Sequence, residues 1–142
     1  MRNKNNNMSI KSLYIFEYVF AAVIAVAIFV LSVIPVPEDT SLSDVPLIDK
    51  WAHMLMYAGL TFAMWVDHVP ILKRPLTFHF LLLMFIAPTA LGGLMELVQA
   101  YCTSHRSGDW IDFVADAIGS FIMTLLCIYI NKLWKEKISP RK

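Results

Sequence analysis

The chain has 142 residues, of which 58% are hydrophobic and 16% are charged, and its formal net charge is +1. Soluble domains are about 45–50% apolar and about 25% charged. A chain this short buries only about two-thirds of the surface that it exposes when unfolded. The composition therefore excludes an ordinary soluble domain and predicts a membrane protein. The near-neutral charge, with no basic run interleaved with aromatic residues, excludes a nucleic-acid-binding protein.

Four apolar segments are each long enough to cross a bilayer, whose hydrocarbon core of about 30 Å requires about 20 helical residues. The first covers residues 13–34. We interpret it as a retained helix, because its apolar run is too long for a signal peptide and no A-x-A-like cleavage site follows. The others cover about residues 49–66, 77–101 and 110–134. The sequence therefore predicts an all-α membrane protein, a four-transmembrane-helix bundle between an N-terminal tail (1–12) and a basic C-terminal tail (135–142).

Lysine and arginine residues are distributed unequally among the predicted loops. They lie before the first segment, between the second and third, and after the fourth, whereas the other two loops carry mainly acids. Because cytoplasmic loops are enriched in Lys and Arg, this bias predicts cytoplasmic N- and C-termini and two extracytoplasmic loops. His68 and His79 then lie near the cytoplasmic ends of their segments, where we expect solvated interfacial side chains.

Polar residues gather at the predicted extracytoplasmic ends of the last three segments, on faces with helical spacing. They are Asp49, His53 and Tyr57 on the second segment, Glu96 and Gln99 on the third, and Asp112 and Asp116 on the fourth. A carboxylate or imidazole that faces lipid costs several kcal/mol, so these side chains should face the bundle or a water-filled cavity.

The catalytic candidates in this cluster are His53, Glu96, Asp112 and Asp116. One imidazole and several carboxylates can act as general acid and base, or can bind a hard divalent cation. No strong metal signature such as H-E-x-x-H occurs, and no Ser or Cys lies in a nucleophile elbow. The sequence therefore predicts no cofactor, assigns no metal ligand and leaves open whether the protein is an enzyme.

The polar cluster also fits an interhelical hydrogen-bond network, in which Asp49 or Asp112 orients His53 and Arg106 neutralises the acids. Arg106 could instead bind a lipid phosphate or a carboxylate through its planar guanidinium group. Lys50 could bind a phosphate, although a lysine at a membrane boundary commonly extends to the headgroups. A proton-linked small transporter is a further alternative, which the lack of paired broken helices and of an evident repeat disfavours.

Three motifs follow one another on successive segments: "DKWAHMLMYAGL" at 49–60, "ELVQA" at 96–100 and "RSGDWIDFVADAIG" at 106–119. Through D-K-x-x-H-x-x-x-Y, E-x-x-Q and R-x5-D-x3-(N or D)-x2-G, the chain resembles the VanZ-like family of small bacterial membrane proteins from about residue 32 to residue 119. The resemblance implies a multi-pass protein of the bacterial cytoplasmic membrane and cell envelope. Its implied partners are the lipid bilayer and an envelope lipid or cell-wall precursor, and it implies a link to tolerance of the lipoglycopeptide teicoplanin.

The family's molecular activity is unsettled, so the resemblance implies a set of residues rather than a reaction. An alternative within it is a membrane-embedded hydrolase or transferase acting on an envelope lipid or lipid-linked glycan. Asp116 stands where many members carry Asn, whose neutral amide cannot act as a base, which makes Asp116 the weakest catalytic candidate. The candidates for substrate binding are Asp49, Lys50, Tyr57, Gln99, Arg106 and Asp109.

Overall fold

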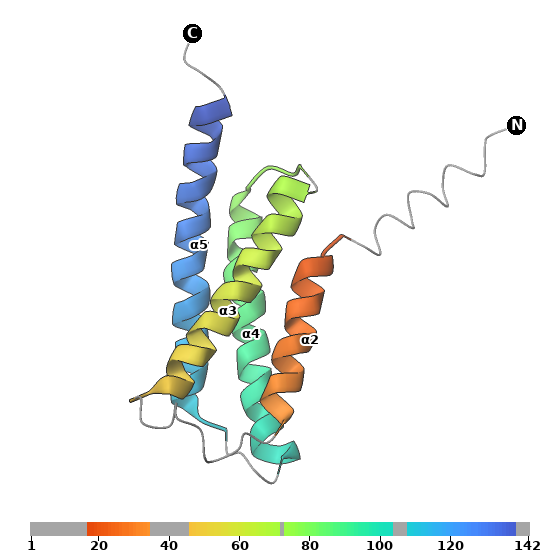
Figure 1. Cartoon of the computed structure of the whole chain (residues 1–142), viewed down its shortest axis with the longest axis vertical. Helices are drawn as coiled ribbons and strands as arrows, with labels where there is room; N and C mark the ends of the chain where they lie inside the picture. Colours follow the sequence, from red (N-terminus) through yellow and green to blue (C-terminus); the bar gives the residue numbers. More distant parts are fainter. Residues whose placement is uncertain (1–16, 35–45, 72, 104–107, 139–142) are drawn as a thin grey trace, which may run out of the picture.

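The computed structural model describes residues 17–34, 46–71, 73–103 and 108–138. These residues form four α-helices and one π-helical turn (Figure 1): α2 (Val19–Val33), α3 (Ile48–Val66), η1 (Asp67–Ile71), α4 (Phe78–Cys102) and α5 (Trp110–Ile138). No described residue lies in a strand. The prediction of an all-helical protein is therefore confirmed.

The four helices lie on the four predicted segments, with differences at their ends. The description begins just before α2, so the predicted tail of residues 1–12 and the predicted helix start at residue 13 lie outside the described residues. α5 continues to Ile138, so the first part of the predicted basic tail is helical. Lys and Glu are good helix formers, and a helix can continue past a membrane boundary into water without losing its backbone hydrogen bonds.

Successive helices run in opposite directions (Figure 1). The start of α3, the end of α4 and the start of α5 lie together at the lower end in this view, which we call the site end. The start of α2, the turn η1 and the end of α5 lie towards the opposite end. α3 packs against all three other helices, most extensively against α5, and α4 also packs against α5. Side chains from α3, α4 and α5 can therefore meet at the site end.

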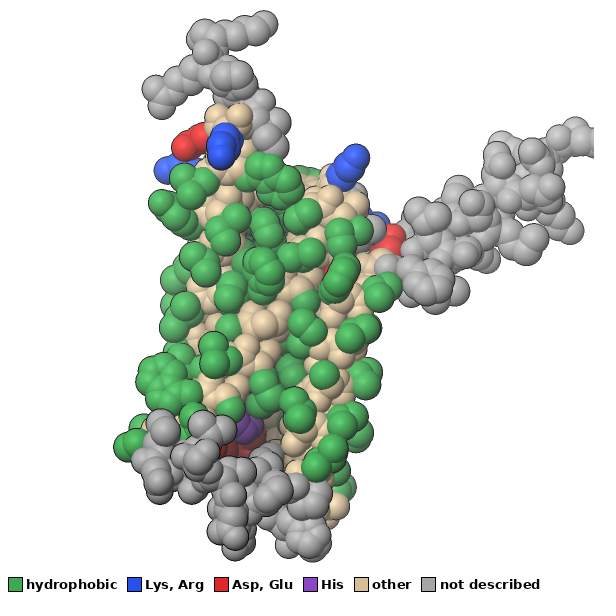
Figure 2. Space-filling model, in the orientation of Figure 1, with side chains coloured by type: hydrophobic (Ala, Val, Ile, Leu, Met, Phe, Trp, Pro, Cys, Tyr) green, Lys and Arg blue, Asp and Glu red, His purple; other side chains and the backbone are tan. Residues whose placement is uncertain are grey.

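The outward-facing surface of the bundle is apolar. Large hydrophobic side chains on α2, α4 and α5 are exposed, including Phe20, Leu94 and Leu125. Figure 2 shows hydrophobic side chains over the middle of the visible face, whereas charged side chains lie towards the two ends. α4 and α5 are each long and apolar enough to cross a membrane. Exposed apolar surface on this scale indicates contact with lipid or another protein.

Glycines allow the three helices of the site end to approach closely. A Cβ at Gly119 of α5 would lie 2.9 Å from both the carbonyl carbon and the Cα of Met54 in α3. A Cβ at Gly92 of α4 would lie 3.0 Å from the Cβ of Asp116. Small residues at helix crossings permit such contact between backbones. The crossings at Gly92 and Gly119 bring polar side chains of different helices within hydrogen-bonding distance.

At the opposite end, His68 of η1, predicted above to be a solvated interfacial histidine, is half-buried and packs against neighbouring residues. Its Nε2 lies 3.3 Å from the carbonyl oxygen of Pro75, and its Nδ1 lies 2.8 Å from the hydroxyl of Tyr18. Because a carbonyl can only accept, the neutral ring donates from Nε2 and accepts at Nδ1. The imidazole also stacks on Phe80, with ring centroids 3.5 Å apart.

This packing predicts a dependence of stability on pH. Burial lowers the pKa of His68, and the charge of Arg74 acts in the same direction. Below about pH 6.5 the unfolded chain therefore gains a proton that the folded chain resists, so stability falls as the pH falls. We expect the melting temperature to fall more between pH 7 and pH 5 in the wild type than in His68→Phe, which retains a ring for stacking. Thermal unfolding in detergent measures both, and parallel pH profiles would contradict the prediction.

Candidate functional site

Lys50 is the cationic centre of the site end. Its ammonium group, in the first turn of α3, lies 2.7 Å from a carboxylate oxygen of Asp49, 2.8 Å from one of Asp109 and 2.6 Å from one of Asp112. The Lys50 side chain is only 16% exposed, so it is held among the three aspartates rather than extended into the surroundings. It provides the neutralisation that the network alternative assigned to Arg106, a residue that lies outside the described residues.

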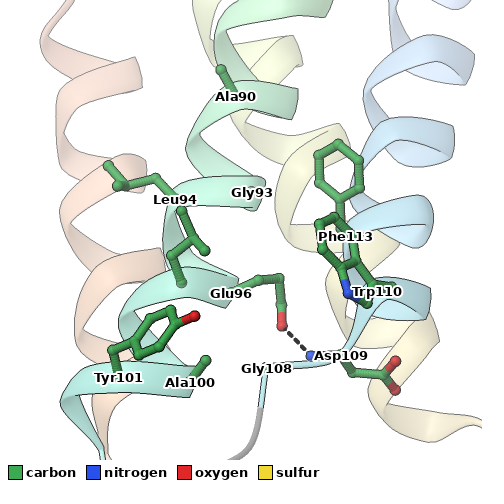
Figure 3. A pocket seen from close by; sticks show the side chains of 11 residues that line it. Ala90, Gly93, Leu94, Glu96, Ala100, Tyr101, Gly108, Asp109, Trp110 and Phe113 are labelled. Atoms are coloured by element: carbon green, nitrogen blue, oxygen red, sulfur yellow. Dashed lines mark hydrogen bonds between the residues drawn. The ribbon is translucent and has the colours of Figure 1, made fainter.

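Asp109 connects the segment before α5 to the two helices beside it. Its carboxylate accepts a hydrogen bond from Lys50, and its backbone N–H donates to Oε2 of Glu96 at 2.7 Å. Figure 3 shows the second contact, with the Asp109 side chain directed away from Glu96. The neighbouring ammonium group of Lys50 holds the pKa of Asp109 below its ordinary value, so this side chain is a carboxylate at neutral pH.

His53, one helical turn beyond Asp49, lies between two aspartates of α5. Its Nδ1 is 2.9 Å from Oδ1 of Asp116, and its Nε2 is 3.9 Å from Oδ2 of Asp112. His53 is 7% exposed and Asp116 is fully buried. The network alternative expected Asp49 or Asp112 to orient His53. That expectation is wrong, because Asp49 pairs with Lys50 and the residue that bonds the ring is Asp116.

Several buried polar atoms at the site end have no hydrogen-bond partner among the described residues. They include Oε1 of Glu96, Oδ2 of Asp116 and the hydroxyl of Tyr57, whereas Oδ1 of Asp112 lacks a hydrogen bond but has its ion pair with Lys50. Tyr57 follows His53 by one turn on the same face of α3 and is 1% exposed. Because the large majority of buried side-chain polar atoms are paired, three unpaired oxygens in one region indicate a capacity to bind something further.

Gln99 differs from the other predicted binding residues. Its amide donates a hydrogen bond to the backbone carbonyl of Ser32 at 3.3 Å, and both residues are buried. This contact joins α4 to the end of α2. The structure therefore uses the Gln99 amide in helix packing.

A groove of about 520 Å³ opens between α4 and α5 beside the cluster. Apolar side chains from both helices form most of its walls, and Glu96 and Asp109 supply the charged side chains in its lining. In Figure 3, Glu96 extends from α4 towards the segment before α5, with Phe113 and Trp110 on the opposite wall. Glu96 also has a carboxylate oxygen close to His53 and Asp112. It is thus the residue shared by the groove and the buried cluster.

The arrangement has two chemical capacities. His53, hydrogen-bonded to Asp116 and facing Asp112, can take up and release a proton between buried carboxylates. His53, Glu96 and Asp112 also each place a potential metal-ligating atom within 4.8 Å of the other two.

Sequence reasoning grouped the polar residues correctly at one end of the helices but missed two features. The first is the triple contact of Lys50. The sequence feature that could have indicated it is the pair of acids Asp109 and Asp112, spaced i, i+3 at the start of α5, which lies beside the start of α3. The second is the groove, whose small residues Ala90, Gly93 and Ala100 carry no chemical signal of their own.

Comparisons of the chain with family models, with curated proteins and with solved structures give no match. The VanZ-like resemblance therefore stays a prediction that rests on the three motifs.

Proposed function

We propose that the protein is a VanZ-like integral membrane protein of the bacterial cell envelope, with four spans, cytoplasmic termini and a site end that faces outward. The apolar surfaces of α4 and α5 support membrane insertion. α3 has 19 residues, enough for a span of about 28 Å, and turns its polar side chains towards the bundle. Lys73 and Arg74, in the connection at the end opposite the site, agree with a cytoplasmic location for that end.

Within this framework, we propose a membrane-embedded hydrolase or transferase that acts on an envelope lipid or lipid-linked glycan. The observation that carries the proposal is that Glu96 belongs both to the apolar groove and to the buried cluster around His53. A lipid chain in the groove would place its headgroup beside acid and base groups. Small-molecule sites commonly have this combination of apolar walls and a few convergent polar groups.

Each residue of the cluster has a role in this reaction. Glu96 or Asp112 acts as the base that removes a proton from the attacking water or hydroxyl group, and His53 returns a proton to the leaving group. Asp116 is a positioning residue, because its contact with Nδ1 fixes the orientation of the His53 ring and leaves Nε2 for the reaction. Lys50 holds Asp112 in place on the opposite side.

A second candidate is a non-catalytic binding or assembly protein. Its support is the ion-pair set of Lys50, which joins the first turn of α3 to both Asp109 and Asp112. Such contacts stabilise the meeting of two helices without any reaction. This candidate predicts that the cluster binds a lipid but never converts it.

The replacement Glu96→Gln tests the proposal. Glutamine retains the size of the side chain and an oxygen that can accept from the backbone N–H of Asp109, but it removes the charge and the base. We expect a folded protein with a similar melting temperature and a loss of turnover of about 100-fold or more. Purified protein in lipid nanodiscs, supplied with bacterial lipid extract and followed by mass spectrometry, provides the measurement.

The matched control is Glu136→Gln, which makes the same chemical change at an exposed position near the end of α5. It should retain full turnover. Full turnover by Glu96→Gln would exclude the catalytic proposal. Binding of a lipid by the wild type without any conversion would favour the binding protein instead.

A further inference from the structure

We infer that His53, Glu96 and Asp112 form a binding site for a divalent transition-metal ion, with Zn²⁺ as the best match, where α3, α4 and α5 meet. The inference rests on the proposed function, because it assigns a metal to the same site. It also revises the roles given there: with a metal bound, His53, Glu96 and Asp112 would be ligands rather than acid and base, and the metal would supply the activation of the attacking water. One potential ligand atom of each residue lies within 4.8 Å of those of the other two. All three residues are buried, with exposed fractions of 7%, 8% and 9% respectively.

The distance between His53 and Asp112 is close to that of a metal site, and the ligand atom of Glu96 lies within 4.8 Å of theirs. Ligand atoms about 2.0–2.2 Å from a tetrahedral Zn²⁺ lie roughly 3.3–3.6 Å from one another. Nε2 of His53 and Oδ2 of Asp112 are 3.9 Å apart. A shift of about half an ångström, within the range of a side-chain rotation, would bring this pair to coordinating geometry. One nitrogen and two carboxylate donors suit Zn²⁺ or Mn²⁺ better than Mg²⁺ or Ca²⁺, which prefer oxygen alone.

The orientation of His53 favours metal binding. In a neutral ring, Nδ1–H donates to Asp116 at 2.9 Å, which leaves the lone pair of Nε2 directed towards Asp112. Metal-ligating histidines almost always donate their other ring N–H to a carboxylate, a carbonyl or water. Asp116 would therefore be the residue that fixes the histidine for the metal, without being a ligand itself.

The charge of the site is a further argument. The described residues of the site carry a single lysine, Lys50, against five carboxylates. These are Asp49, Glu96, Asp109, Asp112 and Asp116. Arg106 adds one positive charge to the same loop by sequence. Asp49 and Asp109 are in contact with solvent, with 58% and 39% of their side chains exposed, whereas Glu96, Asp112 and Asp116 are buried. Three buried carboxylates are unfavourable unless they are protonated or paired with cations, and a dication would offset much of their charge.

The unpaired oxygens are an independent observation that points to a ligand. Glu96 uses Oε2 for the backbone N–H of Asp109, whereas its buried Oε1 has no partner among the described residues. The buried hydroxyl of Tyr57, one turn beyond His53, is also unpaired there. Glu96 can therefore coordinate a metal through Oε1 without giving up its contact with the backbone, and Tyr57 can donate to a ligand or water on that metal.

The test uses the full chain in detergent, stripped with a chelator and then titrated with Zn²⁺, Mn²⁺, Mg²⁺ or Ca²⁺. We expect one Zn²⁺ per chain after desalting, measured by elemental mass spectrometry, with a rise in melting temperature. We expect weaker binding of Mn²⁺ and none of Mg²⁺ or Ca²⁺ at the same concentration. Cys102→Ser serves as the parent protein, because Cys102 is an exposed thiol that could bind zinc by itself.

Variants assign the site. His53→Gln and Glu96→Gln should each lower zinc affinity by at least 10-fold, and Asp116→Leu should do so by about 10- to 100-fold. Asp116→Asn retains an oxygen that accepts from Nδ1 and should bind zinc nearly as the parent does. His79→Gln, at an exposed position, is the control and should leave binding unchanged. Unchanged affinity in His53→Gln and Glu96→Gln would overturn the inference.

A spectroscopic measurement on the parent protein avoids dependence on the folding of any variant. Zinc X-ray absorption should show one imidazole and oxygen ligands, and a shell without imidazole would overturn the inference. Turnover without bound metal would reject the metal and leave the proposed enzyme intact. Bound zinc without turnover would retain the metal site and reject the enzyme.

Discussion

Replacing Gly119 with alanine is expected to lower the stability of the protein by about 1–3 kcal/mol, as overpacking does in a tightly packed interior. The new Cβ would lie 2.9 Å from the carbonyl carbon and the Cα of Met54, and closer still to its carbonyl oxygen. Backbone atoms cannot rotate away as a side chain can, so α3 and α5 must separate. These two helices share the most extensive interface of the bundle.

The matched control is the same replacement at Gly59. Gly59 lies within α3, and like Gly119 it is inside a helix, but a Cβ there would have no described heavy atom within 4 Å. Alanine favours a helix over glycine by about 0.5–1 kcal/mol, so Gly59→Ala should be neutral or stabilising. Thermal unfolding in detergent compares the two variants with the wild type. Melting temperatures that change in the same direction and by the same amount would contradict the close crossing at Gly119.

The crossing also positions the site. Gly119 lies one turn beyond Asp116, so a separation of α3 and α5 should lengthen the contact between Asp116 and His53. We therefore expect Gly119→Ala to weaken zinc binding and turnover, whereas Gly59→Ala should leave both unchanged.

Replacing Lys50 with methionine is expected to lower the free energy of unfolding by about 2–3 kcal/mol. This is somewhat less than the loss on removing one partner of a fully buried ion pair, because the Lys50 side chain is 16% exposed. The methionine side chain has a similar length but carries no charge. Asp109 and Asp112 would then remain close together without their shared cation. The Asp112 side chain is only 12% exposed, so water cannot compensate fully for the lost contact.

Arg74→Met provides the control at the opposite end of the bundle. Arg74 contacts Glu17 at 2.7 Å, and its side chain is 38% exposed. Exposed pairs of this kind contribute little to stability, so the loss should be small. Equal losses in Lys50→Met and Arg74→Met would show that the three carboxylates around Lys50 act as an ordinary surface pair.

The effect of Lys50→Met should also depend on pH. Lys50 lowers the pKa of Asp109 from its ordinary value of 3.8. The stabilisation from this pair is therefore complete above about pH 4 and is lost as the pH falls through the lowered pKa. The difference in melting temperature between the wild type and Lys50→Met should accordingly shrink in acid, and a difference that grew in acid would contradict the assigned pairing.

The sequence by itself was sufficient to predict the helices and the end of the bundle at which the polar residues gather. Runs of apolar residues about 20 long specify helices locally, and the spacing of Asp49, His53 and Tyr57 specifies a stripe on one of them. Their shared end follows from alternating helix directions. These properties depend on near neighbours in the chain, which the sequence displays directly.

Only the tertiary structure decided which partners the polar residues take. The sequence offered Asp49 or Asp112 to His53, and the structure places Asp116 there. It also gives Lys50 three aspartates and opens the groove beside Glu96. These outcomes depend on how far each helix is rotated and how closely it approaches its neighbours. Rotation and approach are set by packing between distant segments, as at Gly119 and Met54, where the absence of a side chain determines which polar atoms meet.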